Sequence, residues 1–369
     1  MRVALDARYG LMANRRGIGV ATYHLLRTWR DMAMTGVEFL AFADNRADAT
    51  VVQEFANSVV KVMVLPGRPF AVWEQLSLPR AARSYRVDLI HALANVGPLT
   101  TSLPLVVSMH DVIEWHRGRD FPSHLSLRHR LSRAYRMKAM ARHAVVARAI
   151  HTVSNHAAED IHRTLSVPMD RIWVAPLGYA LREGPEDPSL LHELGLAPGG
   201  YAMAFGALDP RKNTQLLINL WSTRTMPIEL VVVGLEPRAL AYWRARTASK
   251  ARVHLLGFED DARVKALMQH ALVFVYPSFY EGFGLPVLEA LSLGVPVILG
   301  QGTSAEEIAQ GAALVVTVED LQAWRAAVEH VARDALLRAT LVNRGRAVAK
   351  QYTWANTATR LLDLYRTLQ

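Results

Sequence analysis

The sequence predicts an α/β protein built from two Rossmann-like, doubly wound parallel-sheet domains. The first indication is the length of 369 residues, which exceeds one ordinary α/β core. The second is an alternation of short apolar, β-branched runs with helix-length segments, which is typical of βαβ units and parallel sheets. The third is that this alternation stops near residue 179 and starts again near residue 201. We therefore expect two such sheets, one after the other along the chain.

The expected strands of the first domain, residues 1–178, are apolar runs separated by polar or Gly/Pro-containing segments. They are 3–5, 39–42, 60–64, 89–91, 105–109, 150–153 and 172–175. A helix from about Val20 to Arg30 follows a loop that ends in Gly17-Ile18-Gly19. Gly17 and Gly19 would let the backbone approach a phosphate or an acceptor closely. Turns need glycine too, so the pattern alone leaves both uses open.

The second domain is expected over residues 179–354. It opens with a proline-containing linker and a short helix within 181–200. Its expected strands are 201–205, 230–233, 253–255, 272–276, 295–299 and 313–316. The tail after residue 320 is expected to form at least three helical pieces. The last piece, residues 355–369, is expected to cross back onto the first domain.

Composition narrows the class of protein. Hydrophobic residues make up 51% of the chain and charged residues 20%, as in ordinary globular proteins. The chain has no cysteine, which excludes disulfides, thiolate metal sites and a cysteine nucleophile. No signal peptide is evident, and the apolar runs fall short of the ~20 residues that span a bilayer. We expect a cytoplasmic protein whose contact with a membrane, if it has one, is peripheral.

The net charge of +9 favours a polyanionic partner, and its distribution is uneven. No Asp or Glu occurs from Phe121 to Ala158, where the basic residues are Arg128, Arg130, Arg133, Arg136, Lys138, Arg142 and Arg148. This pattern is similar to a basic amphipathic helix at an anionic membrane surface. A solvated helix face that packs on its apolar side explains it equally well. Nucleic acid is not an expected partner, because Tyr135 is nearly alone as an aromatic residue there.

The most informative segment, residues 276–297, reads YPSFYEGFGLPVLEALSLGVPV. A buried strand is expected to end near Tyr276, and a loop with Gly282 and Gly284 leads to a helix that starts at about Pro286. Glycines before a helix let backbone amides face an anion, and the helix dipole favours a diphosphate there. Doubly wound sheets bind nucleotides at such strand ends.

Two carboxylates accompany this helix. Glu281 lies in the loop, and Glu289 is expected in the first turn of the helix. A carboxylate accepts two hydrogen bonds from a vicinal diol, which both a sugar and a ribose offer. The pair therefore indicates a sugar-nucleotide site. The alternative is that Glu289 complements the helix N-terminus and Glu281 is solvated.

These residues resemble a known family. Glu281-x7-Glu289 within Glu-Gly-Phe-Gly-Leu-Pro is similar to the signature of the retaining family 4 glycosyltransferases of GT-B fold. Further pieces follow in the family's order: Gly17-Ile18-Gly19, Trp73-Glu74-Gln75, His110-Asp111, Thr152-Val153-Ser154, Gly206, Arg211-Lys212-Asn213, Val232-Val233-Gly234, Gly257 and Tyr352-Thr353-Trp354. The resemblance covers nearly the whole chain, and it implies two domains that face each other across a cleft.

The resemblance also implies roles for individual residues. Glu281 would hold the hydroxyls of the donor sugar, with help from the backbone of the segment Gly282, Phe283, Gly284 and Leu285, while Glu289 would hold the ribose. Arg211 and Lys212 look like the family's pyrophosphate clamp. His110 would contact the donor sugar, and Gly17 and Gly19 would line the phosphate or acceptor. Without the resemblance, Arg211-Lys212 would be a solvated pair and His110 a structural histidine. Asp111 would orient His110 or cap the next segment.

One departure from the family pattern concerns the clamp. Relatives often carry arginine after the glycine that corresponds to Gly206, but this chain has Ala207, which leaves the clamp one cation short of that pattern. No Asp-x-Asp motif occurs in a strand-end context, and Asp260-Asp261 precedes a helical segment that it is expected to cap. We therefore expect no metal requirement. If the family's chemistry holds, the anomeric configuration is retained and the leaving phosphate accepts the acceptor's proton.

The donor and acceptor follow from the resemblance alone. The His110-Asp111 region and the Gly17-Ile18-Gly19 loop look most like bacterial polysaccharide and lipopolysaccharide mannosyltransferases, which implies GDP-mannose as the donor substrate and no separate cofactor. The implied acceptor is a glycan, free or linked to polyprenyl diphosphate. A UDP-sugar donor, a GT-B epimerase or phosphorylase, and a non-catalytic GT-B-like partner subunit stay open as alternatives.

Overall fold

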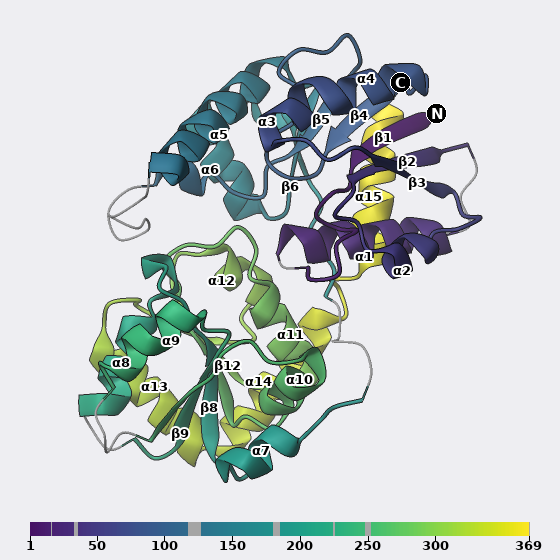
Figure 1. The fold of residues 1–369 in the computed structure, drawn as a ribbon. Helices are drawn as coiled ribbons and strands as arrows, with labels where there is room; N and C mark the ends of the chain where they lie inside the picture. Colours follow the sequence, from purple (N-terminus) through teal and green to yellow (C-terminus); the bar gives the residue numbers. More distant parts are fainter. Residues whose placement is uncertain are drawn as a thin grey trace. The chain divides into compact units, whose positions relative to one another are not determined.

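The computed structural model describes residues 1–15, 17–32, 36–116, 127–179, 185–223, 226–247 and 252–368. These residues form two compact units. Unit 1 is built from residues within 1–115, 127–178 and 352–368, and unit 2 from His116 and residues within 179–351. Each unit has a parallel sheet with helices packed on it (Figure 1).

Unit 1 contains a seven-stranded sheet in the order β3-β2-β1-β4-β5-β6-β7, and every pair of neighbours runs parallel. Its strands are β1 (Arg2–Asp6), β2 (Glu38–Asp44), β3 (Val60–Leu65), β4 (Leu89–Ala92), β5 (Leu105–Ser108), β6 (Ala149–Thr152) and β7 (Ile172–Val174). Its helical segments are α1 (Ile18–Asp31), α2 (Ala49–Gln53), α3 (Phe70–Val72), η1 (Trp73–Ser77), α4 (Leu78–Ser84), η2 (Ile113–Trp115), α5 (Leu127–Val146), α6 (Asn155–Leu165), η4 (Met169–Arg171) and α15 (Trp354–Thr367).

The inner strands of this sheet are buried on both faces. In β2, Phe39 belongs to a hydrophobic cluster with Trp29 of α1, whereas its neighbour Phe42 belongs to a second cluster with Trp73. Successive side chains of a strand point to opposite faces, so a strand covered on both sides needs an unbroken apolar run. This requirement explains why the apolar runs of the sequence identify the strands.

The last helix, α15, completes one face of the sheet in unit 1. It packs against α1, and the two helices lie side by side in Figure 1. Leu361 and Tyr365 of α15 join Trp29 and Phe39 in one cluster. The N-terminal unit is therefore completed by the C-terminal end of the chain.

A chain of buried hydrogen bonds connects α15 to the sheet. The Tyr365 hydroxyl lies 2.6 Å from His91 Nδ1, and His91 Nε2 lies 2.8 Å from the Ser108 hydroxyl. The same hydroxyl lies 2.7 Å from His151 Nδ1, and His151 Nε2 lies 3.3 Å from the Ala175 carbonyl. Because a carbonyl only accepts, we assign the hydrogens in one direction, from Tyr365 through His91, Ser108 and His151 to Ala175. Both imidazoles are then neutral.

Unit 2 contains a six-stranded parallel sheet in the order β10-β9-β8-β11-β12-β13. Its strands are β8 (Tyr201–Phe205), β9 (Glu229–Val233), β10 (Val253–Leu255), β11 (Val273–Tyr276), β12 (Val297–Gly300) and β13 (Leu314–Val316). Its helical segments are α7 (Ser189–Leu194), η5 (Pro210–Lys212), α8 (Thr214–Thr223), α9 (Pro237–Arg244), α10 (Asp261–Gln269), α11 (Leu285–Leu293), α12 (Ser304–Ala309), α13 (Leu321–Arg333) and α14 (Ala335–Ala349).

The strand order locates the chemistry in each unit. In each sheet the strands that follow one another in sequence are added first on one side and then on the other. The direction changes between β1 and β4 in unit 1 and between β8 and β11 in unit 2. Open α/β sheets bind ligands outside the carboxyl ends of the strands at such a switch point. The loops that follow β1 and β4, and those that follow β8 and β11, are therefore the places to look for a site.

The predicted architecture of two Rossmann-like parallel-sheet domains is confirmed, and each predicted apolar run coincides with an observed strand to within two residues at either end. Asp260 and Asp261 lie at the start of a helix, as expected, but the expected capping hydrogen bond of Asp260 is not formed. Asp260 is the N-cap residue of α10, but its side chain makes no capping hydrogen bond.

The basic segment forms α5, but its residues do not share one role. Arg133 and Arg136 turn to Glu114 of η2, with Arg133 also donating to the Glu114 carbonyl. Leu131, an apolar residue of the same helix, is 64% exposed. The side chain of Arg128 and residues 121–126 lie outside the described part of the chain. None of the helices in the described ranges combines the length and the apolar character needed to cross a membrane.

Candidate active site

Two of the predicted site residues meet at the switch point of unit 2. Lys212 ends η5, which follows β8, and Glu281 lies in the loop that follows β11. The Lys212 ammonium donates to Glu281 Oε1 over 2.6 Å. The Glu281 side chain is 10% exposed and that of Lys212 is 25% exposed. A cation and a carboxylate that are 69 residues apart in sequence thus form a partly buried ion pair at the expected edge of the sheet.

The loop that carries Arg211 and Lys212 is held by hydrogen bonds from within the loop and from the loop after β11. The Asp209 carboxylate accepts from the Arg211 amide over 3.0 Å and from the Arg211 guanidinium over 3.2 Å. The Phe279 amide, from the loop after β11, donates to the Arg211 carbonyl over 2.8 Å. This last bond joins the two loops directly, so Arg211 and Lys212 are held beside the segment that carries Glu281.

The Glu281 loop is held from the other side by α12. The buried Ser304 hydroxyl donates to the Glu281 carbonyl over 2.7 Å. Gly284, the N-cap of α11, has φ 105°, a conformation that side chains rarely adopt. A Cβ there would also lie 3.1 Å from the Ala305 Cβ. Glycine at 284 therefore serves both the turn and the close approach of α12.

Glu281 is ionised at neutral pH. Burial opposes the charged form, but the charges of Lys212 and Arg211 and hydrogen bonds from Lys212 and Ser278 outweigh it, and the pKa of the Glu281 carboxyl lies below its ordinary value. The carboxylate is thus an acceptor, which is the form that binds sugar hydroxyls.

Glu289 lies on α11 but not where the sequence predicted. The helix begins at Leu285, directly after the Gly284 N-cap, and not at Pro286. Glu289 is therefore the fifth residue of the helix and lies in its second turn, not the first. Complementing the free amides of the N-terminus is a role for first-turn residues, so this position weakens the purely electrostatic explanation of Glu289.

Ala207 occupies the position where the family pattern has a cation. Its amide donates to the Thr214 hydroxyl over 3.0 Å, and its carbonyl accepts from the Trp243 indole over 3.0 Å. Both contacts involve backbone atoms of Ala207, so they do not depend on its side chain. The charges that act on Glu281 are those of Lys212 and Arg211.

The remaining predicted residues lie in unit 1. Gly17 is the N-cap of α1 with φ 47° and ψ −111°, and a Cβ added to it would meet nothing within 4 Å. Gly19 differs, because a Cβ there would lie 2.6 Å from the Tyr9 carbonyl oxygen. Gly17 thus opens a space at the helix start, whereas Gly19 is required by the packing of the β1–α1 loop on α1.

His110 follows β5 and is held on two sides. Its amide donates to the Asn95 side chain over 2.9 Å, and its Nε2 lies 3.1 Å from the Leu93 carbonyl. Burial lowers the pKa of the His110 imidazole, against the opposing effects of the Leu93 carbonyl and the charge of Asp111. Because Nε2 faces a carbonyl, we assign the hydrogen to Nε2, which leaves Nδ1 as an acceptor for a ligand hydroxyl. Asp111 caps the next segment by accepting from the Ile113 amide over 3.2 Å.

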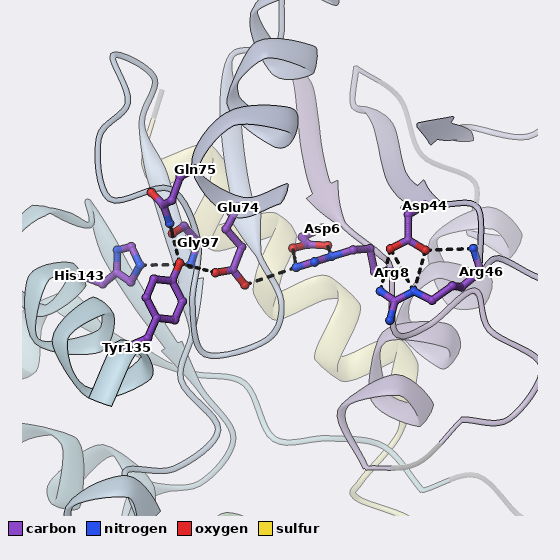
Figure 2. A network of polar contacts seen from close by, with 9 residues as sticks. All are labelled: Asp6, Arg8, Asp44, Arg46, Glu74, Gln75, Gly97, Tyr135 and His143. Atoms are coloured by element: carbon purple, nitrogen blue, oxygen red, sulfur yellow. Dashed lines mark hydrogen bonds and ion pairs between the residues drawn. The ribbon is translucent and has the colours of Figure 1, made fainter. Parts of the chain in front are cut away.

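A buried polar network lies at the switch point of unit 1 (Figure 2). Arg8, which is 2% exposed, makes a bidentate pair with Asp6 at 3.0 and 2.9 Å and reaches Glu74 at 3.3 Å. The Tyr135 hydroxyl donates to the other Glu74 oxygen over 2.8 Å and accepts from Gln75 over 2.9 Å. Burial is the main cause that raises the pKa of the Glu74 carboxyl to about 8.

This network explains the motif Trp73-Glu74-Gln75. The three residues open η1, a π-helical turn between α3 and α4, and π turns are frequent at functional sites. Two of the three side chains point into the network shown in Figure 2, which ties β1 to α5. Tyr9, next to Arg8, is the residue whose carbonyl Gly19 approaches. The network thus fixes the start of the β1–α1 loop.

Sequence reasoning missed three residues that shape the site in unit 2: Tyr276, Ser278 and Ser304. Only Tyr276 had a visible signal, because a tyrosine at the end of a buried strand brings its hydroxyl to the ligand edge of the sheet. In the described part of the chain, no cluster of three or more His, Asp or Glu side chains is arranged to hold a metal ion.

Comparisons with known proteins agree with this geometry. The family model "Glycosyltransferase Family 4" matches residues 15–183, and "Glycosyl transferases group 1" matches residues 199–348. The O-antigen chain mannosyltransferase B of Escherichia coli is 34% identical over 60% of this chain and 61% of the relative, so the match spans about three fifths of that protein's length. The D-inositol 3-phosphate glycosyltransferase of Nocardia farcinica is 28% identical over 94% of this chain and 84% of the relative.

Among solved structures, the chain is similar to HepE of Anabaena, determined in complex with UDP and glucose. The TM-score is 0.75, the match covers 100% of both chains, and the sequence identity is 18%. At this identity the likeness concerns the fold.

Proposed function

We propose a function from the premise that this chain belongs to the family 4 glycosyltransferases, has the GT-B fold and resembles bacterial O-antigen mannosyltransferases. It transfers a hexose from a nucleotide-diphosphate sugar to a glycan acceptor in surface polysaccharide biosynthesis. The observation that carries the proposal is the ion pair of Lys212 and Glu281, because it brings a diphosphate-binding cation and a sugar-binding carboxylate to one point at the start of α11.

The cations act on the leaving group. As the glycosidic bond to the nucleotide breaks, negative charge accumulates on the diphosphate, and fixed positive groups that face it lower the barrier. Lys212 and Arg211 lie on a short loop whose backbone is hydrogen-bonded to the neighbouring loop, so the backbone stays in place while the side chains reach the diphosphate. The N-terminus of α11 adds its dipole at the same place. These groups supply the charge that a metal ion supplies elsewhere, and we propose a metal-independent reaction.

Glu281 positions the sugar and does not attack it. Its carboxylate accepts hydrogen bonds from the donor hydroxyls, while Ser278 and Lys212 fix its orientation. Retention then follows from the leaving phosphate, which takes the proton of the acceptor hydroxyl on the face where the new bond forms. Holding donor and acceptor in register supplies the remainder of the rate enhancement.

Further contacts are proposed on the predicted residues. Glu289 accepts from the ribose hydroxyls, and Gly282, Phe283, Gly284 and Leu285 present their backbone to the sugar and the diphosphate. In unit 1, neutral His110 accepts from a sugar hydroxyl at Nδ1, and the loop at Gly17 lets the ligand approach α1.

The donor we propose is GDP-mannose, on the likeness to the mannosyltransferase of Escherichia coli. A UDP-sugar is the alternative, since HepE was solved with UDP and glucose. The acceptor is a growing glycan, free or carried on polyprenyl diphosphate.

A lipid-linked acceptor would bring the enzyme to the inner leaflet of the cytoplasmic membrane. On α5, Arg130, Lys138 and Arg142 are exposed together with Leu131 and Val145, which suits a peripheral contact with anionic lipid. Cosedimentation with phosphatidylglycerol vesicles tests this contact, with phosphatidylcholine vesicles as the control.

The first test is a thermal-shift panel of GDP, UDP, GDP-mannose, UDP-glucose and UDP-N-acetylglucosamine, all in EDTA, followed by a transfer assay with the donor that binds. A ligand that binds only the folded state raises the melting temperature. A shift with one nucleotide and its sugar, and transfer without metal, support the proposal. A folded protein that none of these ligands shifts contradicts it and favours a non-catalytic partner subunit.

A further inference from the structure

The Tyr276 hydroxyl lies at the centre of the candidate site, and no role has yet been assigned to it. Tyr276 is the last residue of β11, and its hydroxyl accepts from the Lys212 ammonium over 3.3 Å. The Glu281 carboxylate accepts from the same ammonium over 2.6 Å, so the hydroxyl and the carboxylate meet at one cation. Since the hydroxyl oxygen accepts from Lys212 and a carboxylate only accepts, the hydroxyl hydrogen is available to Glu281. Tyr276 therefore lies beside both members of the ion pair.

The bridge matters because Lys212 has two tasks. In the structure its ammonium donates to Glu281 over 2.6 Å. In the proposed reaction the same ammonium must face the donor diphosphate. As Lys212 turns toward the phosphates, Glu281 loses its nearest counter-charge while its side chain is only 10% exposed to water. A buried carboxylate that loses a charged partner in this way is destabilised, and Ser278 is one donor that remains.

Tyr276 is suited to be a second donor, because its position does not depend on Lys212. Its backbone pairs with Leu299 of β12, its side chain is 4% exposed, and its ring stacks on Phe274 with centroids 5.9 Å apart. Lys212, in contrast, stands on a three-residue helical turn. A group fixed by a central strand keeps its geometry when a flexible lysine moves.

We propose that Tyr276 is a positioning residue that keeps the Glu281 carboxylate oriented toward the donor sugar when Lys212 turns to the diphosphate. This role rests on the function proposed above. In the structure the Lys212 ammonium also lies 5.3 Å from the centre of the Tyr276 ring, which is a cation–π distance.

The test is Tyr276→Phe, which removes one oxygen and keeps the ring. The matched control is Tyr201→Phe, since Tyr201 begins the neighbouring strand β8, is fully buried and donates its hydroxyl to the Leu267 carbonyl over 2.6 Å. Both variants lose a buried hydroxyl in the same sheet, but Tyr201 lies at the amino end of its strand, whereas the site loops follow the carboxyl ends. Donor kcat/KM is measured against pH for the wild type and both variants, and GDP and UDP binding by calorimetry.

Tyr276→Phe is expected to lower kcat/KM about tenfold or more, as expected for a lost hydrogen bond to a charged group, and to leave nucleoside diphosphate binding within about threefold. The acid limb of the pH profile moves upward, because the hydroxyl stabilises the ionised form of Glu281. Tyr201→Phe lowers the melting temperature and keeps the wild-type profile.

Two results overturn parts of this reasoning separately. If the wild type transfers sugar and Tyr276→Phe keeps its kcat/KM and its acid limb, or if Tyr201→Phe shifts the limb equally, the positioning role is wrong and the proposed function stands. If the wild type neither binds a nucleoside diphosphate nor transfers sugar, the proposed function is wrong and the role of Tyr276 falls with it.

Discussion

Replacing Glu281 by glutamine is expected to tighten the binding of a free nucleoside diphosphate while it abolishes sugar transfer. In the structure, Lys212 donates to Glu281 over 2.6 Å, so a diphosphate must compete with this carboxylate for the ammonium. Glutamine keeps the size of the side chain and an acceptor oxygen but removes the charge. The competition and the repulsion between carboxylate and diphosphate both disappear.

The magnitude follows from the distance and the exposure. At 2.6 Å and an effective dielectric constant of about 20, the gross attraction is about 6 kcal/mol. Desolvation and solvent screening cancel most of it, because the Lys212 side chain is 25% exposed and that of Glu281 is 10% exposed. We expect a net effect of about 1–2 kcal/mol, or roughly tenfold tighter binding of GDP or UDP.

Calorimetry on the wild type and Glu281→Gln at low and high salt measures this effect, and a transfer assay follows activity. Glu289→Gln is the matched control, because the same chemical change at the proposed ribose contact should weaken binding of the same nucleotide. The advantage of Glu281→Gln should shrink as salt rises. Unchanged or weaker diphosphate binding in Glu281→Gln would refute the competition and the assignment of Lys212 to the phosphates.

Three further outcomes are expected. Lys212→Ala should weaken GDP or UDP binding at least about tenfold more than guanosine or uridine binding, since charge-assisted bonds to phosphate are lost, and equal losses in calorimetry would argue against a phosphate role. The folded-state pKa of His143 is about 4 and that of His151 about 3, both lowered mainly by burial below the ordinary 6.5. The unfolded chain therefore binds more protons than the folded chain, and the free energy of unfolding should fall as the pH drops from about 6.5. The expected loss is roughly 3 kcal/mol per histidine at pH 4. Urea titrations at several pH values would detect this loss, and a flat profile would contradict it. The sign is opposite for Glu74, whose pKa of about 8 lies above the ordinary 4.5, so wild-type stability falls as the pH rises through this window. Glu74→Gln should remove this pH dependence of stability. Melting temperatures of the variant and the wild type are compared between about pH 6 and 9. A difference between the two that stays constant over this range would count against the prediction.

The sequence predicted the sheets well because their inner strands are buried on both faces. A strand such as β2 cannot contain a charged residue between Phe39 and Phe42, so its apolar run is visible without any knowledge of the fold. Helix ends were less certain, as α11 shows. Its start depends on the conformation of Gly284, which makes Glu289 the fifth residue of the helix, one residue further along than predicted.

The candidate site was proposed from the sequence as a set of residues and not as an arrangement. Glu281 and Lys212 were both found from motifs, yet their contact depends on β8 and β11 being neighbours, and this follows from the strand order and not from local sequence. The Arg8 network was missed for a similar reason. Its members Asp6, Glu74 and Tyr135 come from three distant segments, and each alone resembles an ordinary polar residue. Side-chain partners across a sheet are fixed by packing, which local patterns do not encode.

The return of α15 to unit 1 has a consequence for the synthesis of the protein. A chain emerging from a ribosome usually folds its N-terminal domain first. Here that domain cannot be finished until residues 352–368 have been made, because Tyr365 completes the hydrogen-bond chain at His91 and covers Trp29. Unit 2 can fold earlier, because all of its described strands and helices precede residue 352. The residues of unit 1 that precede unit 2 in the sequence are thus among the last to reach their native packing. A ribosome that stops short of α15 releases a polypeptide in which unit 1 has an uncovered apolar face.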